Sequence, residues 1–459
     1  MTRPAPATSL FEVAARALWP KPRNAQAREL ARDAIIDTLG CMVAGRDETV
    51  VRAVTSAHQA SGLPDGPCRV VGGLAAPPFA AARINGTAAH ALDFDDNFEA
   101  GMSHASAVLV PALIAVAQAT DKAPIQVVES YLVGLQAQAE VGRALGYGHY
   151  TAGWHATSTV GCIGTACGVA HLLGLCPDGV EQAMSVAVSF ASGTKGQFGT
   201  PVKPFHAGLA AGNAVEAAYL AQAGLTGRSD ILERPQGLLE MFAGTAGNNA
   251  PSVQSGQADV PAPHSHAIQA PGLAPKRFAC CGSTHLAIDA LLDLVAAHGF
   301  TAEQVAKIDI LVGRANYRNL PYARPVDGHE ARFSMHYCLT RALRSGTVSL
   351  SDFSHATVAA REDDPMLSLI SMTHRSAEEE AANGDRLAHV VEVTLTDGAV
   401  LRGERRRAKG TLSDPFSNAD KAAKLAQCTA HMGDHVPDFD ALHRCFMADD
   451  LQCIDPLFL

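Results

Sequence analysis

Long runs of small and apolar residues, spaced as in α-helices, are the feature that most restricts how this chain can fold. Between residue 7 and about residue 245, apolar side chains recur at positions i, i+3 and i+4, and several runs are apolar nearly all round. Helices of that kind are buried in the middle of a bundle, and their alanines and glycines let neighbouring helices approach closely. We therefore predict helices at residues 8–18, 25–45, 106–120, 127–146, 158–175, 181–193 and 209–225.

The pattern changes after residue 245. Residues 246–275 are rich in Pro, Gly, Ser, Gln and Ala, which is typical of a linker or an irregular connection. Residues 307–314 and 390–406 then alternate apolar and polar side chains as half-buried strands do, and Asp397–Gly398 suits a hairpin turn. Helical patterns return at 283–297, at 330–345 and over the last fifty residues.

These patterns define a fold class. The chain has 459 residues, which is long for a single core. We predict a mainly α protein with a large all-helical domain, residues 1–270 together with 406–459, and a smaller α+β domain, residues 271–405.

Charge and cysteine content restrict the partners and the compartment. A formal net charge of −10 argues against a nucleic-acid or anionic-membrane surface, which would carry a basic patch. The 11 cysteines show no repeating pattern, which favours a reducing cytoplasm over a disulfide framework. We find no signal-peptide pattern, and the apolar windows are expected to fall short of a membrane span. The sequence thus predicts a soluble cytoplasmic protein without nucleic-acid or membrane partners.

A dense group of titratable residues interrupts the apolar helices at residues 90–106, HALDFDDNFEAGMSHAS. Carboxylates are seldom buried unless something compensates their lost hydration. At helical spacing Asp93 and Asp96 share one face. In one interpretation the stretch is the end of a helix, and its acids lie in solvent or cap the next helix. In the other it forms one wall of a site, and Asp95, Asp96 and Glu99 are only charges at the end of the helix.

Two further stretches combine basic residues with helix starts. His155 in GWHATSTVG precedes a small apolar helix expected to begin two or three residues later, and a helix N-terminus can hold an anion. The alternative is a histidine that only caps or packs. Lys203 lies between Pro201 and Pro204, which restrict its backbone, and close to His206; this favours an anion-binding lysine over a solvated one.

The second half of the chain contributes a cysteine pair and a tyrosine. Cys280 and Cys281 have no C-x-x-C partner or well-spaced histidine pair, so we predict no metal site there. They lead instead into a helix with His285 in its first turn. Tyr317 follows a predicted strand and is either a site residue or an ordinary packing aromatic. The motifs G-x-G-x-x-G, G-x-S-x-G and H-E-x-x-H are absent, which removes most support for nicotinamide, acyl-serine and zincin chemistry.

Taken in order, these stretches resemble the MmgE/PrpD family, which includes 2-methylcitrate dehydratase, cis-aconitate decarboxylase and iminodisuccinate epimerase. The resemblance extends from about residue 8 to 430 and is carried by NGTAAHALDFDD, GWHATSTVG, FGTPVKPFHAG, CCGSTHLAIDA and EARFSMHY. It implies a helical domain built from both ends of the chain, a smaller α+β lid domain, a homodimer, and a site between the domains that needs no cofactor.

The resemblance also implies particular site residues. Decarboxylase-like members of the family point to Asp93, His104, His155, Lys203 and Tyr317 in this chain. Of these, the two histidines, the tyrosine and the aspartate are expected to be catalytic, and the lysine is expected to bind substrate.

Two positions depart from that pattern. Asn97 stands where those members have threonine, and Cys281 replaces a histidine ahead of the lid-domain helix, which leaves His285 one turn further on. We expect all three to lie in the substrate-binding part of the site. The departures weaken a transfer of cis-aconitate decarboxylation in particular, and the CCGSTH form resembles the epimerase-like branch.

The chemistry shared by such enzymes acts on a C–H bond next to a carboxylate in a di- or tricarboxylic acid. The site must supply a base and stabilise the negative charge that develops. Removing the proton and losing hydroxide from the neighbouring carbon is dehydration, whereas returning the proton to the opposite face is epimerisation. We predict a dehydratase-type lyase first, an epimerase of an iminodisuccinate-like dicarboxylate second, and a non-catalytic metabolite-binding protein third.

Overall fold

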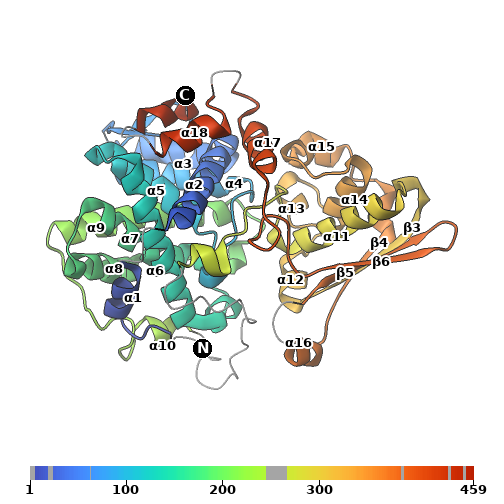
Figure 1. Ribbon diagram of the computed structural model, residues 1–459, viewed down its shortest axis with the longest axis horizontal. Helices are drawn as coiled ribbons and strands as arrows, with labels where there is room; N and C mark the ends of the chain where they lie inside the picture. The colour runs from blue at the N-terminus through green and yellow to red at the C-terminus, as the bar shows by residue number, and fades with distance from the viewer. Residues whose placement is uncertain are drawn as a thin grey trace.

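The chain folds into two lobes that lie side by side, a large helical lobe and a smaller lobe of helices and strands (Figure 1). The predicted fold class, mainly α with a smaller α+β part, is confirmed. Of the predicted connection at 246–275, residues 246–265 lie outside the part of the chain that the structure describes. The computed structural model describes residues 6–18, 24–62, 64–243, 266–383, 387–432, 436–447 and 451–459.

The large lobe contains all the helices predicted for it and adds three that were not predicted, α3, α4 and α10. α2 begins after Asn24, whose side-chain oxygen accepts a hydrogen bond of 2.9 Å from the backbone N–H of Gln26, and it ends at Gly45 as predicted. α5 and α7 lie in the middle of the lobe with nearly all their residues buried. Its helices are α1 Leu10–Leu18, α2 Ala25–Gly45, α3 Thr49–Ala60, α4 Pro78–Ala91, α5 Ser106–Thr120, α6 Pro124–Thr151, α7 Ala156–Leu173, α8 Pro177–Phe190, α9 Val202–Gln222, α10 Leu238–Phe242, α17 Asn418–Thr429 and α18 Phe439–Cys445.

Small residues let these helices pack at close range. A Cβ atom at Gly208 in α9 would overlap the carbonyl oxygen of Arg83 and the side chain of Thr87, both in α4. A Cβ atom at Gly164 in α7 would similarly overlap Gln138 in α6. Because interiors are close-packed, such contacts fix the distances between helices and hence the places where their ends meet.

In the part of the chain that the structure describes, one helix meets the length and composition of a membrane span. α7 has 18 residues of mean hydropathy 1.3, so the expectation that every apolar window is too short was wrong. Of this helix, 89% is buried inside the protein. Burial among α5, α6, α8 and α9 accounts for its apolar character.

The smaller lobe packs helices on one mixed sheet of strand order β4-β3-β5-β6. The predicted strands are present, with the hairpin turn at Asp397 and Gly398, but β4 was not predicted; it pairs parallel to β3 at the edge. Figure 1 shows α11 and α14 beside this sheet. The elements are α11 Gly282–His298, β3 Val305–Val312, α12 Arg314–Asn319, α13 Gly328–Ala331, α14 Met335–Ser345, α15 His355–Ala359, β4 Ile370–His374, α16 Ala377–Asn383, β5 His389–Leu395 and β6 Val400–Arg405.

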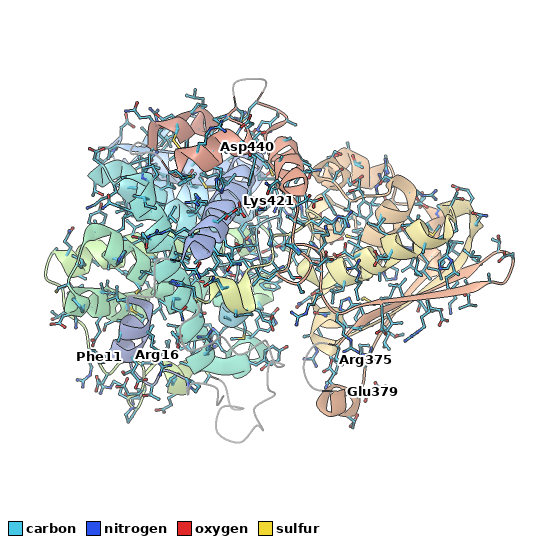
Figure 2. All side chains as sticks on the ribbon, in the orientation of Figure 1. Phe11, Arg16, Arg375, Glu379, Lys421 and Asp440 are labelled. Atoms are coloured by element: carbon cyan, nitrogen blue, oxygen red, sulfur yellow. A yellow bond between two sulfur atoms is a disulfide. The ribbon has the colours of Figure 1, made fainter. Side chains whose placement is uncertain are left out.

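Ion pairs attach the returning C-terminal segment to the large lobe. Lys421 in α17 pairs with Asp33 in α2 at 2.7 Å, and Lys424 pairs with Asp37 at the same distance. Figure 2 labels Lys421 where α17 lies beside α2. The contact places the segment after β6 next to the junction of the two lobes.

The structure adds two features that the sequence did not indicate. A two-stranded hairpin forms from β1 Cys68–Arg69 and β2 Ala75–Ala76. Cys445 and Cys453 form a disulfide, although cysteine usage favoured reduced thiols throughout; they are only eight residues apart. Both features lie outside the junction between the lobes.

The close approach of α4 and α9 is open to a direct test. Replacing Gly208 by Ala should lower the free energy of unfolding by about 2 kcal/mol, because the new methyl group overlaps α4 backbone. Gly196→Ala is the matched control, since this glycine is exposed and a Cβ there meets only Thr194. Urea denaturation of the two variants makes the comparison, and equal stabilities would contradict the packing argument.

Candidate active site

The site is centred on the loop between α4 and α5. α4 ends at Ala91, and Asp93 adopts a left-handed conformation with φ of 52°. The predicted shared helical face of Asp93 and Asp96 is therefore wrong, because both residues follow the end of the helix. Asp93, Asp95 and Asp96 are all buried, which also excludes solvated helix-end charges for Asp95 and Asp96.

Asp93 is held by two lysines from distant parts of the chain. Lys203 in α9 donates a short hydrogen bond to one carboxylate oxygen. Lys276, whose side chain is fully buried, lies 3.2 Å from the other oxygen and donates to the Asp93 backbone carbonyl at 2.8 Å. Burial alone would raise the pKa of Asp93, but the two ammonium groups outweigh it and hold the pKa well below its ordinary value. The carboxylate is therefore ionised.

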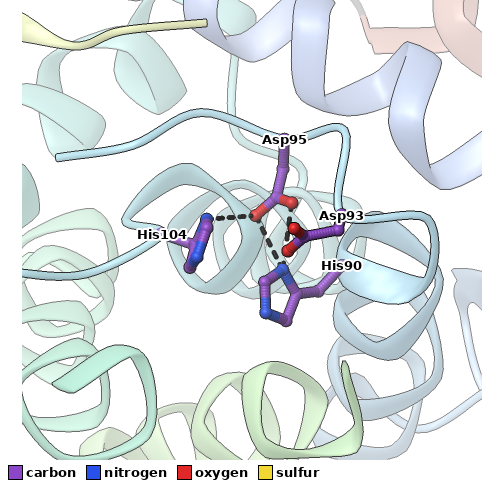
Figure 3. A group of neighbouring side chains, drawn as sticks. All are labelled: His90, Asp93, Asp95 and His104. Atoms are coloured by element: carbon purple, nitrogen blue, oxygen red, sulfur yellow. Dashed lines mark hydrogen bonds and ion pairs between the residues drawn. The ribbon is translucent and has the colours of Figure 1, made fainter. Parts of the chain in front are cut away.

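Asp95 orients two imidazoles. The His90 Nδ1 lies 2.9 Å from both carboxylate oxygens, and the His104 Nδ1 lies 3.4 Å from Asp95 and 2.9 Å from the Asp96 carbonyl oxygen (Figure 3). Burial raises the pKa of Asp95, but the neighbouring histidines outweigh burial and hold the pKa below its ordinary value. The carboxylate is therefore ionised and can only accept hydrogen bonds. Each Nδ1 therefore carries the hydrogen, and each Nε2 is left with a lone pair.

Asp96 has a structural task. It accepts a short hydrogen bond from the Ser106 hydroxyl and one of 3.4 Å from the Ser106 backbone N–H, at the first residue of α5. Ser106 in turn lies 2.6 Å from the Tyr131 hydroxyl. Burial raises the pKa of Asp96 to about 7. Acids of residues 90–106 were expected to cap the following helix, and Asp96 does so at the first residue of α5.

A second histidine pair faces the site from α7 and α9. His155 is the N-cap residue of α7, which begins at Ala156, one or two residues before the predicted start. The His155 Nδ1 lies 3.0 Å from the Nδ1 of His206. The His155 Nε2 is buried without a hydrogen-bond partner among the described residues. Burial, followed by the charge of neighbouring groups, lowers the pKa of His155 well below its ordinary value and that of His206 to about 4. Both imidazoles are neutral at physiological pH.

The residues predicted in the second half of the chain lie at the edge of this cluster or away from it. Cys281 is buried at the start of α11, and burial and then the charge of Asp93 raise the pKa of its thiol. Asn97 exchanges backbone hydrogen bonds of 2.9 Å with Ala274, and its amide lies against Gly282. These two residues therefore border the site from the lid side.

His285 and Tyr317 do not join the acid/base cluster. The His285 Nε2 donates to the Cys280 carbonyl oxygen at 3.2 Å, so the ring is fixed within the small lobe. Tyr317 in α12 is 39% exposed, and its ring packs edge-on against His374 at 4.8 Å. No described contact connects the Tyr317 side chain to Asp93.

A cleft of about 270 Å³ opens beside Asp93 and Lys203. Its other polar lining groups are His90 and Thr200 from the large lobe and His329 and Arg332 from the small lobe, with Phe333 as an apolar wall. Sequence reasoning missed four residues of this site. They are His90, His206, Lys276 and Arg332. His90, His206 and Arg332 lie inside motifs that carried the family resemblance, and Lys276 lies four residues before such a motif, so it was their roles that were overlooked.

The cluster was also considered as a metal centre. His90, Asp93, Asp95 and His104 bring ligand-type atoms within 4.8 Å of one another. However, Asp93 is already paired with two ammonium groups, and Asp95 accepts the Nδ1 hydrogen of His90 with His104 close by. A divalent cation there would face two positive charges, so the arrangement favours acid/base chemistry over metal binding.

Fold and site together define a two-lobed, mainly helical protein with a buried acid/base cluster beside a cationic cleft. The chain belongs to the MmgE/PrpD family: the model of the MmgE/PrpD N-terminal domain matches residues 15–250, and that of the C-terminal domain matches residues 278–446.

Characterised relatives of this chain carry one activity in their names. This chain is 28% identical to the cis-aconitate decarboxylase of Homo sapiens over 76% of its own length and 72% of that protein. It is 27% identical to the enzyme of Mus musculus over 85% of this chain and 80% of that protein. It is 26% identical to the enzyme of Aspergillus terreus over 85% and 82% of the two chains.

The buried charge balance around Asp93 predicts a stability effect. Replacing Lys276 by Met should lower the free energy of unfolding by about 3 kcal/mol, because it removes one partner of a buried ion pair. Lys307→Met, which removes an exposed partner of Asp309, should cost less than about 1 kcal/mol. Adding Asp93→Asn to Lys276→Met should recover part of the loss. Chemical denaturation of the wild type, these variants and the Asp93→Asn single variant tests this, and additive effects of Asp93→Asn and Lys276→Met would contradict the coupling.

Proposed function

We propose that this protein is an enzyme that removes a proton next to a carboxylate of a small di- or tricarboxylic acid, as a dehydratase-type lyase. The observation that carries the proposal is the presence of buried, neutral histidines with free Nε2 atoms beside the Asp93–Lys203 ion pair. Membership of the MmgE/PrpD family supports it.

The histidines are suited to act first as bases. Burial lowers the pKa values of His90, His104 and His155, so each ring is neutral at physiological pH. In His104 the Nδ1 hydrogen is committed to the Asp96 carbonyl oxygen, which leaves Nε2 to accept a proton. A base must also be aligned by its other nitrogen, and Asp95 supplies that alignment for His90 and His104.

The lysines are suited to stabilise the negative charge that develops on a substrate carboxylate. Lys203 donates one described side-chain hydrogen bond, to Asp93, and an ammonium group has further N–H donors to offer. In a buried site such fixed charges act strongly because little water screens them. A substrate carboxylate would therefore share Lys203 with Asp93 rather than meet a free lysine.

Decarboxylation of cis-aconitate is the second candidate, since the relatives named above are cis-aconitate decarboxylases. After loss of CO2 that reaction needs a proton donor, whereas the histidines of this site are held in the neutral form. Asn97 and Cys281 also stand where decarboxylase-like members are expected to have threonine and histidine. We therefore place proton abstraction first.

Incubation with citrate, 2-methylcitrate, cis-aconitate and iminodisuccinate in deuterated water tests the proposal. We expect loss of water from a hydroxy acid with deuterium exchange at the neighbouring carbon, measured by NMR and mass spectrometry. Deuterium uptake without loss of water or CO2 would favour the epimerase, and CO2 release from cis-aconitate would favour the decarboxylase. His104→Gln should lower the rate by about a hundredfold or more, whereas His298→Gln at the exposed end of α11 should not.

Direct titration tests the assignment of the bases. A histidine whose pKa is lowered releases its proton at lower pH, so its neutral form persists further into the acid range. The Cε1–H signals of His104 and His155 should therefore titrate well below about 6.5, the value of an exposed histidine. NMR of histidine-labelled protein, assigned with His104→Gln and His155→Gln, makes the measurement. Titration at or above that value would contradict their role as bases.

A further inference from the structure

Among the described residues, the side chain of one buried arginine in the cleft has no ion-pair partner. Arg332 follows α13 in the small lobe, lines the cleft and is only 5% exposed. Its Nε atom has no hydrogen-bond partner, and no carboxylate among the described residues forms an ion pair with it. Its guanidinium group lies over the face of the Phe353 ring, at 5.5 Å, and the charges of Glu48 and Asp93 act on it without forming an ion pair. Buried arginines are ordinarily paired, since an isolated charge is costly away from water.

The charges that line the cleft do not balance. Asp93 and Lys203 neutralise each other by direct contact. Behind them Lys276 and Asp95 supply one further charge of each sign. Arg332 is therefore left as the positive charge of the cleft that no described acid offsets by contact, and the site as a whole favours an anion.

The backbone holds Arg332 in a fixed place. Asp327 caps α13 by accepting a hydrogen bond of 2.9 Å from the Glu330 backbone N–H. The Arg332 carbonyl oxygen accepts a hydrogen bond of 2.9 Å from the Cys281 N–H, at the start of α11. The next residue, Phe333, places its ring 5.2 Å from the Lys203 ammonium group. Arg332 thus belongs to the rim of the small lobe that meets the catalytic side of the large lobe.

We propose that Arg332 is a specificity-determining residue that binds one carboxylate of the substrate from the small lobe, while the groups of the large lobe act at the other end. A guanidinium group matches a carboxylate with two parallel hydrogen bonds, which gives both strength and orientation. Substrates with two carboxylates would bridge the lobes, whereas a monocarboxylate would leave one charge unpaired. The inference rests on the proposed function for the class of substrate, but it makes its own claim about binding.

Succinate and butyrate provide a matched pair of probes, since they have the same carbon chain and differ by one carboxylate. Calorimetric titration of the wild-type protein should give tighter binding of succinate than of butyrate. Arg332→Met should weaken succinate binding about tenfold to a hundredfold and leave butyrate binding nearly unchanged. Arg324→Met is the control, because this nearby arginine is exposed and contacts only Ser368 among the described side chains.

A structural role for Arg332 would give a different result. If the residue only supports the fold, Arg332→Met and Arg332→Gln will both lower the melting temperature of the ligand-free protein, which overturns the proposal. If it awaits an anion, removal of an unpaired buried charge should leave that temperature unchanged or raise it. Unchanged succinate affinity in either variant would also overturn the proposal.

The two proposals can fail separately. Succinate binding that depends on Arg332 in a protein without deuterium exchange would overturn the proposed reaction and leave the role of Arg332 standing. Turnover of a dicarboxylate with unaltered KM in Arg332→Met would overturn the role of Arg332 and leave the proposed reaction standing.

Discussion

The buried ion pairs of Asp93 with Lys203 and Lys276 are the interaction on which the arrangement of the site depends. They join the loop after α4, the start of α9 and the segment that enters the small lobe, which are far apart in the sequence. Burial of such charges is costly unless they are paired and hydrogen-bonded. Here each lysine has an anionic partner, and Lys276 also satisfies the backbone carbonyl of the left-handed residue. The same contacts therefore fix the loop and set its protonation state.

The packing of the surrounding helices explains how this loop can lie so close to the start of α9. Glycine and alanine contacts between α4 and α9 bring Asp93 and Lys203 to one point, since these residues lie at the end of one helix and the beginning of the other. On the far side, Lys424 donates to the Phe94 carbonyl oxygen at 2.8 Å while it pairs with Asp37. The loop is thus held from the large lobe, from the lobe junction and from the C-terminal segment, which is the rigidity that an acid/base site requires.

Periodicity predicted the helices of the large lobe whose apolar runs are long, but not α3, α4 and α10. The hairpin of β5 and β6 was predicted because its turn residues are diagnostic. β4 was missed because it is a five-residue edge strand with mixed burial. In the site, Asp93, His104, His155 and Lys203, which the family resemblance implied, lie in one cluster, and their roles stay a prediction. The buried roles of Asp95 and Lys276 could not be read from the sequence, because they arise from a left-handed residue and from contacts across long sequence distances.

The position of Cys281 bears on which chemistry this member of the family can perform. Its thiol lies near Asp93 and is kept protonated by burial and by that carboxylate, so it is neither a base nor a strong acid there. Where related members are expected to carry a histidine, this chain therefore has one proton-transfer group fewer on the lid side. The histidines held neutral beside Asp93, which are His90, His104 and His155, come from the large lobe, whereas His329 lines the cleft from the small lobe. Under the proposed function, these three neutral histidines would act from one side of the substrate, which suits elimination better than an exchange of protons between opposite faces.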